Sequence, residues 1–128
     1  MSNPAGKPTV MVVDDSRTIL ESAKLFLGEN YNVVLVKNGF SALAALEDHR
    51  PDVLFLDVVM PQLDGFNTCL AIKDNPDFQD LPIIILSSKD SPFDKAHGRL
   101  MGCDDYLTKP FTQQGLLASV RKHLQRSS

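Results

Sequence analysis

The chain has 128 residues, 43% of them apolar, and a formal net charge of −3. This size and composition are typical of one globular domain and argue against disordered, collagen-like and disulfide-scaffold proteins. Because the charge shows no basic excess, a general DNA-binding role is also disfavoured. No apolar run approaches the roughly 20 residues of a membrane-spanning helix, and the first residues do not resemble a secretory signal, so we predict a cytoplasmic protein.

Five short apolar runs are predicted to be strands. In chain order they cover Thr9–Val13, Asn32–Val36, Val53–Leu56, Pro82–Leu86 and Asp105–Thr108. All but the last are nearly continuous stretches of apolar residues rather than alternating ones. This pattern indicates strands that are buried on both faces, as in a parallel sheet covered by helices.

Longer amphipathic segments follow the strands and are predicted to be helices. The first ends at Gly28, and its apolar stripe consists of Ile19, Leu20, Ala23, Phe26 and Leu27. The second and third end at Pro51 and Pro76, and the fifth ends near Gln125. We therefore expect one domain over residues 9–125, with a flexible N-terminal tail at 1–8 and a C-terminal tail at 126–128.

The alternation of strand and helix, repeated five times, predicts an α/β fold. Right-handed crossovers between parallel strands place helices on both faces of one central sheet. In such a sheet, binding sites form at the carboxyl ends of the strands. The residues at those ends are therefore the candidates for function.

Polar residues that could carry chemistry follow four of the predicted strands. Asp14 and Asp15 follow the first, Asp57 the third, Ser87 the fourth and Lys109 the fifth. Each has a structural explanation when taken alone, because an Asp or Ser often caps the next helix and a Lys is usually solvated. That explanation is weakest for Asp57, since the next helix begins several residues later. We expect these side chains to lie together at one edge of the sheet.

Three neighbouring carboxylates repel one another at neutral pH and favour a bound cation. Their oxygen atoms suit Mg²⁺, which in proteins uses one or two carboxylates, several waters and a phosphate oxygen. A carboxylate beside such an ion can attack phosphorus and form an acyl phosphate. A nearby ammonium group and a hydroxyl can bind the phosphoryl oxygens, because phosphoryl transfer depends mainly on positioning and charge neutralisation.

The order of these residues resembles the receiver domain of bacterial two-component response regulators over roughly Val10–Leu124. The motifs that carry the resemblance are Val-Val-Asp14-Asp15-Ser, Leu-Phe-Leu-Asp57-Val-Val-Met-Pro61-Gln-Leu-Asp-Gly65, Ile-Leu-Ser87-Ser-Lys and Tyr106-Leu-Thr-Lys109-Pro110-Phe. The resemblance implies a doubly wound, flavodoxin-like (βα)5 fold with strand order 2-1-3-4-5. It also implies a phosphorylation-dependent signalling switch, which assists only its own phosphorylation and dephosphorylation and is not a metabolic enzyme.

The resemblance also implies a role for each residue of the predicted site. Asp57 would accept the phosphoryl group from a histidine kinase, and Lys109 would bind that group. Mg²⁺ would be held by Asp14, Asp15 and Asp57, together with the backbone carbonyl of Val59.

Further residues would form the switch and the binding surface. Ser87 would be the hydroxyl that contacts the phosphoryl group, and Tyr106 the aromatic side chain that changes rotamer. A downstream protein would bind the face formed by the fourth helix, the fifth strand and the fifth helix, where Lys95, Arg99 and Tyr106 lie. The Lys109–Pro110 peptide bond would be cis.

The stretch from Ser87 to Gly102 is similar to stand-alone receivers in chemotaxis-like pathways that control type IV pilus twitching motility. We therefore favour a stand-alone protein without an output domain. Two residues depart from well-studied chemotaxis members, since Val59 is apolar and Lys89 is basic. Both positions influence how fast the phosphoryl group is hydrolysed in such proteins, so the resemblance predicts no phosphate lifetime.

Functions of other classes remain open at this point. A phosphatase would use an aspartyl nucleophile in Asp14-Asp15-Ser16, but such enzymes commonly carry a second Asp where Ser16 stands. A flavin- or nucleotide-binding module would need glycines or hydroxyls in the first strand–helix turn, and this turn is acidic and glycine-free. A receiver that has lost an output domain is a further possibility.

The cysteines and histidines do not form a recognisable motif. Cys69 and Cys103 lack the spacing of a metal site, and we interpret them as reduced thiols, one in the core and one in a turn. His49, His97 and His123 are isolated in the sequence, and we interpret them as surface or boundary residues.

Overall fold

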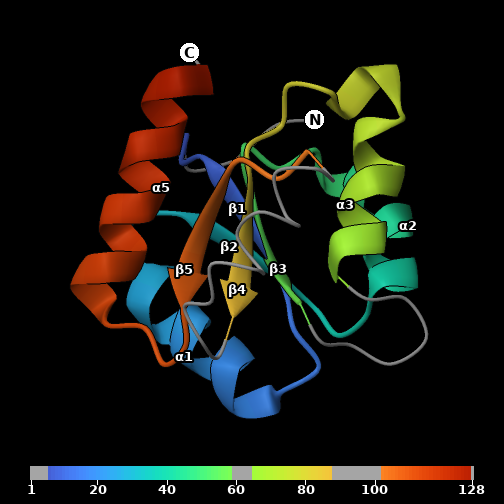
Figure 1. Cartoon of the computed structure of the whole chain (residues 1–128). Coiled ribbons are helices and arrows are strands. Elements are labelled where there is room, and N and C mark those ends of the chain that lie inside the picture. Colours follow the sequence, from blue (N-terminus) through green and yellow to red (C-terminus); the bar gives the residue numbers. More distant parts are fainter. Residues whose placement is uncertain (1–5, 59–64, 88–101, 128) are drawn as a thin grey trace.

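The computed structural model describes residues 6–58, 65–87 and 102–127 (Figure 1). Val59, Lys95 and Arg99, to which the resemblance assigns roles, lie outside these ranges. The expected fourth helix lies outside them as well. The predicted phosphoryl site, by contrast, falls almost entirely within the described residues.

A five-stranded parallel sheet forms the centre of the fold (Figure 1). Its strands are β1 (Thr9–Val13), β2 (Asn32–Val36), β3 (Val53–Asp57), β4 (Ile83–Ser87) and β5 (Asp105–Thr108). They lie in the order β2-β1-β3-β4-β5, which confirms the α/β fold and the strand order implied by the resemblance. β3 and β4 each end one residue later than predicted, so Asp57 and Ser87 occupy the last strand positions.

Helices cover both faces of this sheet (Figure 1). α1 (Arg17–Leu27) and α5 (Gln113–Ser127) pack on one face, and α2 (Gly39–His49) and α3 (Gly65–Lys73) pack on the other. A short 3₁₀ helix, η1 (Pro76–Phe78), follows α3 and begins at the proline that was predicted to end that helix. α5 continues to Ser127 instead of ending near Gln125, because no Gly or Pro stands there to stop it.

Local signals explain where the first two helices begin and end. The Ser16 side chain accepts a hydrogen bond at 3.4 Å from the amide three residues later and caps α1, and Asn38 caps α2 in the same way at 2.8 Å. α1 ends at Gly28, as predicted. α2 ends at Arg50, which adopts a left-handed backbone with φ of 43° directly before Pro51.

Burial of a strand depends on its position in the sheet. In the three central strands, the residues Val10–Val13, Val53–Leu56 and Ile83–Leu86 are at most 1% exposed. β2 lies at the edge and is only half-buried along most of its length, with Leu35 38% exposed. The prediction that β2 is buried on both faces is therefore wrong, because an edge strand has a neighbour on one side only.

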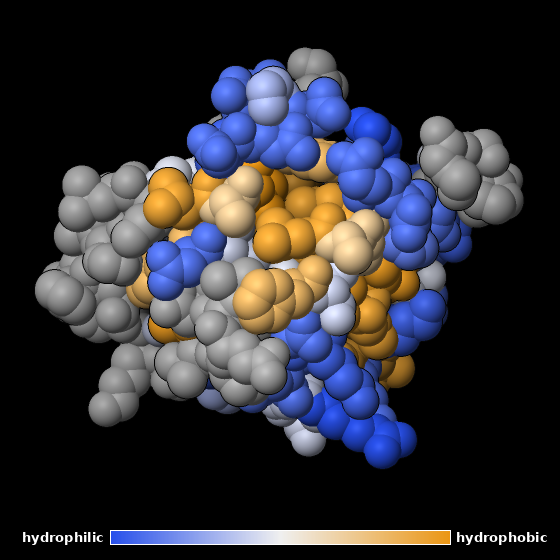
Figure 2. All heavy atoms as spheres, turned by 90° about the vertical axis from the view of Figure 1, so that its right-hand side faces the viewer, coloured by the Kyte–Doolittle hydropathy of each residue, from blue (hydrophilic) through white to orange (hydrophobic). Residues whose placement is uncertain are grey.

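Two large apolar side chains are exposed on the helices of one face. Phe40 in α2 is 56% exposed, and Leu70 in α3 is 49% exposed. Figure 2 views the molecule from the side of these helices and shows apolar surface near the centre, bordered by hydrophilic residues. Single exposed apolar side chains are common on soluble proteins, so these two do not by themselves mark a binding site.

His123 is buried, which corrects its interpretation as a surface or boundary residue. It lies on α5, is 1% exposed, and its Nε2 lies 2.8 Å from Oδ2 of Asp105 at the start of β5. The Tyr106 amide donates to the other carboxylate oxygen at 2.8 Å, and Lys122 Nζ lies 3.3 Å from Oδ2. Burial opposes ionisation of Asp105, but these contacts, led by the one with His123, hold its pKa below the usual value. The pair joins α5 to β5.

Removing the Asp105 carboxylate should therefore weaken the fold in a pH-dependent way. Asp105→Ala leaves the buried His123 ring without this partner, so the free energy of unfolding should fall by about 1–3 kcal/mol at pH 7. Because the pKa of Asp105 is lowered by folding, this contribution is complete above about pH 4 and is lost as the pH falls through the lower folded-state value. Urea unfolding at several pH values measures the difference, with the exposed Asp48→Ala as control. A gap between Asp105→Ala and wild type that stays constant down to pH 2 would contradict this assignment.

Candidate functional site

The carboxyl ends of the strands bring the predicted site residues to one edge of the sheet. Asp14 directly follows β1, and its amide donates to the carbonyl of Val36 at the end of β2 at 3.0 Å. Lys109 directly follows β5, and its amide donates to the carbonyl of Ser87 at 2.6 Å. Asp57 is the last residue of β3, between these two pairs of strands. The sheet itself therefore sets the spacing of the side chains.

Three carboxylates form an acidic cluster at this edge. Asp14, Asp15 and Asp57 each offer a carboxylate oxygen, and these oxygens all lie within 4.8 Å of one another. Asp14 is 0% exposed and Asp57 is 4% exposed, whereas Asp15 is exposed. An oxygen-rich cluster of this kind could hold a hard divalent cation, and the exposed Asp15 opens it to solvent.

Lys109 provides the positive charge of the site. Its Nζ lies 3.0 Å from Oδ1 of Asp57 and 3.1 Å from Oδ2 of Asp14, and its side chain is 16% exposed. Burial alone would lower the pKa of Lys109, but the hydrogen bonds and charges of Asp57 and Asp14 raise it above its usual value. The ammonium group therefore stays charged at neutral pH and links the two buried carboxylates.

In the turn between β1 and α1, one residue caps the helix and a different residue contributes to the acidic cluster. The sequence allowed Asp14 or Asp15 to be no more than the cap of the first helix. In the structure Ser16 caps α1, while Asp14 Oδ1 accepts a hydrogen bond from the Ser16 amide at 2.8 Å. The other oxygen of Asp14 contacts Lys109. The Ser immediately before the apolar stripe was the signal for the cap, and it leaves Asp14 oriented toward the site.

Ser87 and Tyr106 lie on the two strands beside the acidic cluster. Ser87 is 5% exposed at the end of β4, and Tyr106 is half-buried in β5 with a buried hydroxyl oxygen. In the register of these strands Ile85 pairs with Tyr106 and Ser87 pairs with Thr108. Since side chains alternate along a strand, Ser87 and Tyr106 point to the same face of the sheet, the face covered by α2 and α3.

Gly65 holds the start of α3 against the end of β3. Its amide donates to the carbonyl of Val58 at 3.1 Å, and a β-carbon built on Gly65 would overlap the backbone carbonyl oxygen of Asp57. The close approach of the two backbones is therefore what requires glycine at this position. The Lys109–Pro110 peptide bond is cis, as the resemblance implied.

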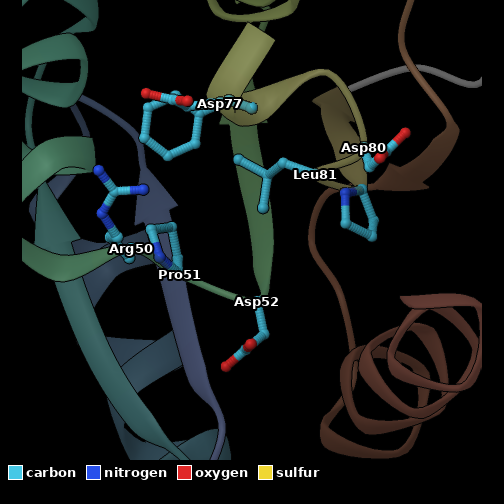
Figure 3. Close-up of a pocket in the computed structure, with 8 residues that line it drawn as sticks. Arg50, Pro51, Asp52, Asp77, Asp80 and Leu81 are labelled. Carbon is cyan, nitrogen blue, oxygen red and sulfur yellow. The ribbon is translucent and has the colours of Figure 1, made fainter. Parts of the chain in front are cut away.

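The structure also contains a cavity at the amino ends of the strands, on the side of the sheet away from the acidic cluster (Figure 3). It measures about 210 Å³ and is lined by Arg50, Pro51, Asp52, Asp77, Phe78, Asp80, Leu81 and Pro82. Asp52 and Pro82 precede β3 and β4, so the cavity lies at the amino ends of these strands. The Arg50 guanidinium lies over the Phe78 ring at 5.6 Å from its centre. This cavity is separate from the acidic cluster.

The family of the protein follows from comparison with known sequences. The model of the response regulator receiver domain matches residues 10–121. The chain belongs to this family. A receiver domain of a two-component system acts in phosphorylation-dependent signalling and is not a typical enzyme, so family membership sets aside the phosphatase and flavin-binding alternatives. It also implies a histidine kinase as phosphodonor and a downstream effector.

Individual relatives and solved structures agree with this assignment. The receiver is 47% identical over 116 residues to Protein PilG of Pseudomonas aeruginosa, a match that covers 90% of this chain and 86% of PilG. It is 42% identical over 120 residues to Response regulator MprA of a Mycobacterium species, covering 93% of this chain but only 51% of MprA.

Among solved structures, chemotaxis protein CheY4 of Vibrio cholerae superposes with a TM-score of 0.88 at 31% identity, covering 91% of this chain and 98% of that one. A putative response regulator from Chloroflexus aurantiacus superposes with a TM-score of 0.89 at 35% identity, covering 94% and 99%. The fold and the family therefore agree. Among the described helices of the receiver, none combines the length and apolar character needed to span a membrane.

Removing the positive charge of the site should destabilise the receiver. Lys109→Met removes the ammonium group that contacts the buried carboxylates of Asp14 and Asp57, so the free energy of unfolding should fall by about 3 kcal/mol at pH 7. Lys122→Met is the matched control, because Lys122 pairs with Asp105 at 3.3 Å but is 66% exposed. Its loss should change stability by no more than about 0.5 kcal/mol. Urea unfolding compares the two variants. Equal losses of unfolding free energy would contradict the prediction that the buried contacts of Lys109 stabilise the fold more than the exposed contact of Lys122.

Proposed function

We propose that this receiver is a phosphorylation-dependent switch in which Asp57 accepts a phosphoryl group from the phosphohistidine of a histidine kinase. The observation that supports this most strongly is the cluster of three carboxylates within 4.8 Å, with Lys109 Nζ 3.0 Å from Asp57. Asp57 combines two properties that a phosphoacceptor needs. Its carboxylate contacts the positive charge of Lys109, and it lies at the sheet edge beside the solvent-exposed Asp15.

The donor set fits Mg²⁺, which supplies neutralisation of the phosphoryl charge when it is bound. The three carboxylates carry −3 and Lys109 carries +1, which leaves a formal charge of −2 for a divalent cation to balance. Asp14, Asp15 and Asp57 provide oxygen ligands, and the backbone carbonyl of Val59 is proposed as a further one. Asp15 is the more direct ligand in this proposal because, unlike Asp14, it is exposed.

In the proposed transfer, a carboxylate oxygen of Asp57 attacks phosphorus and the bond between phosphorus and the donor nitrogen breaks. The Lys109 ammonium then contacts a phosphoryl oxygen. This contact needs only a small shift from the present hydrogen bond to Asp57, because the phosphoryl group is attached to that same carboxylate. The residues of the chain thus supply positioning and charge, which is what phosphoryl transfer requires.

The added charge then biases the surface that binds a partner. Ser87 moves toward the phosphoryl group, and Tyr106 follows because the two side chains share one face of the sheet. Lys95 and Arg99, with Tyr106, belong to the proposed binding surface of the fourth helix, β5 and α5. A phosphoryl group that interacts better with one arrangement of these groups shifts the population toward it and changes partner affinity.

We propose a chemotaxis-like receiver of the type IV pilus twitching-motility kind, in line with the similarity to PilG and CheY4. The match covers most of PilG, whereas it covers only about half of MprA. In this proposal the protein acts in the cytoplasm, binds a target protein rather than DNA, and assists only its own phosphorylation and dephosphorylation.

Mass spectrometry after treatment with acetyl phosphate tests this function directly. The wild-type protein should gain one labile phosphoryl group in the presence of Mg²⁺ and almost none after the metal is removed with a chelator. A chromogenic phosphate ester, added in a parallel assay, should not be turned over. Rapid turnover of the ester without a retained phosphoryl group would instead support a phosphatase.

A further inference from the structure

The thiols of Cys69 and Cys103 meet where α3 packs beside the segment that enters β5. Cys69 is fully buried in α3, and Cys103 is half-buried just before the strand begins. Cys103 packs against the core cluster that contains Cys69, and each thiol shifts the pKa of the other. Neither forms a disulfide in the structure, in agreement with the interpretation of both as reduced thiols.

The residues on both sides of Cys103 lie close to Lys73, which is on the same helix as Cys69. On one side Gly102 has a φ of 90°, and a β-carbon built on it would lie 3.4 Å from Cγ of Lys73. On the other side Asp104 Oδ2 lies 3.3 Å from Lys73 Nζ and accepts a hydrogen bond from the Ile83 amide at 2.8 Å. Lys73 lies one helical turn beyond Cys69 on α3, so the contacts on both sides of Cys103 come from the same helix face.

Lys73 is itself held firmly in place. Its ammonium group donates to the carbonyls of Leu81 at 2.6 Å and Gln79 at 3.0 Å, and its side chain is only 18% exposed. The segment before β5 is therefore anchored to α3 by the partly buried Lys73 and to the start of β4 by Asp104. Because this packing already holds Cys103 beside the helix that carries Cys69, bringing the two sulfur atoms together requires little additional ordering of the chain.

We propose that Cys69 and Cys103 form a reversible disulfide when the protein is oxidised, which covalently joins α3 to the segment leading into β5. With hydrogen peroxide as oxidant, both S–H bonds and the O–O bond break and one S–S bond forms. The two sulfur atoms together lose two electrons, the peroxide is reduced to two water molecules, and both thiol protons leave in that water. A thiol reductant reverses the reaction by disulfide exchange.

The two cysteines contribute different properties to this reaction. The interaction with the Cys103 thiol lowers the pKa of Cys69, burial opposes this, and the charge of Lys73 adds to the lowering. The same interaction raises the pKa of Cys103. Cys69 therefore supplies the thiolate, which is the reactive form, and the partly exposed Cys103 lies where a small oxidant reaches the pair.

The disulfide would restrain the segment that leads into β5. β5 in turn leads directly to Lys109, the residue that supplies the positive charge beside the acidic cluster. In a reducing compartment the pair stays as thiols, and disulfides that form there are usually transient and redox-sensing. The sequence showed no motif for this site because the two cysteines are far apart along the chain.

Peptide mapping of the full chain tests the proposal. Fully reduced wild-type protein is treated with hydrogen peroxide, remaining thiols are blocked with iodoacetamide, and the digest is analysed without reductant. A peptide pair linked through Cys69 and Cys103 is expected, together with a rise of roughly 5–10 °C in the unfolding midpoint that a thiol reductant reverses. Cys103→Ser is the matched control and should show neither the linked peptides nor the rise.

Two results with the wild-type protein would overturn the proposal. Both can be measured even if the Cys103→Ser variant does not fold. One is peroxide-treated protein in which both thiols still react with iodoacetamide. The other is oxygen added to the sulfur atoms, or links between molecules, without the internal cross-link. Asp57→Asn should form the same disulfide as wild type, so failure of the proposed phosphoryl transfer leaves this test unaffected.

Discussion

Asp57→Asn is expected to abolish phosphoryl labelling by acetyl phosphate completely. An amide is a poor nucleophile, and Asn cannot form the acyl phosphate that the proposed function requires. The side chain keeps nearly the same shape and an oxygen that can still accept from Lys109, so the fold should be retained. Intact-mass measurement in the presence of Mg²⁺ should show one added phosphoryl group in wild type and none in the variant.

Asp80→Asn is the matched control for this experiment. It makes the same chemical change at an exposed aspartate that lines the cavity at the opposite edge of the sheet. This variant should be labelled to the same extent as wild type. If Asp57→Asn is labelled as well, the phosphoryl group is attached elsewhere, and peptide mapping of the adduct would identify the residue that accepts it.

Gly65→Ala is expected to have the largest effect on stability, lowering the free energy of unfolding by about 4 kcal/mol or more. The added methyl group would overlap the backbone carbonyl oxygen of Asp57 and approach Val58, and neither backbone atom can rotate away. The start of α3 or the end of β3 must shift, which would also displace the carboxylate of Asp57. Urea unfolding measures the loss, and phosphoryl labelling of the folded fraction measures the displacement.

Gly115→Ala provides the comparison at a tolerant position. Gly115 lies in the first turn of α5, and a β-carbon there would meet only Oγ1 of the Thr112 side chain, at 3.1 Å. Thr112 Oγ1 accepts a hydrogen bond from the Gly115 amide and needs to shift only slightly, and Ala favours the helix over Gly by up to about 1 kcal/mol, so stability should change little or rise. A Gly65→Ala variant as stable as Gly115→Ala would show that the two backbones can separate without cost.

Local patterns were sufficient to locate the strands and helices that the structure describes, to within one or two residues. The run Ile83–Ile85 is so continuously apolar that only burial on both faces accommodates it, and the structure places it in the central strand β4. Gly28 and Pro51 ended the first two helices where predicted, because glycine and proline act on the backbone of their immediate neighbours. The same local reasoning failed for the burial of β2. An apolar run looks the same in a central strand and in an edge strand, and only the strand order places β2 at the edge of the sheet.

The gathering of site residues at one edge was also predictable in outline. Asp14, Asp57 and Lys109 each follow or end a strand, and parallel strands present their carboxyl ends together. The sequence did not show that Lys109 contacts both buried carboxylates, or that Asp15 is the one exposed member. These details depend on side-chain orientation within the sheet edge.

The sequence by itself determined the α/β alternation, the candidate residues at the strand ends and, through its motifs, the resemblance to receiver domains. Only the tertiary structure decided that His123 is buried against Asp105, that Gly65 contacts the backbone of Asp57, and that Cys69 meets Cys103. The reason is that strands, helices and their ends follow from interactions between residues close in the chain. Contacts between distant residues depend on how the helices pack on the sheet, and no local pattern of residue types encodes that packing.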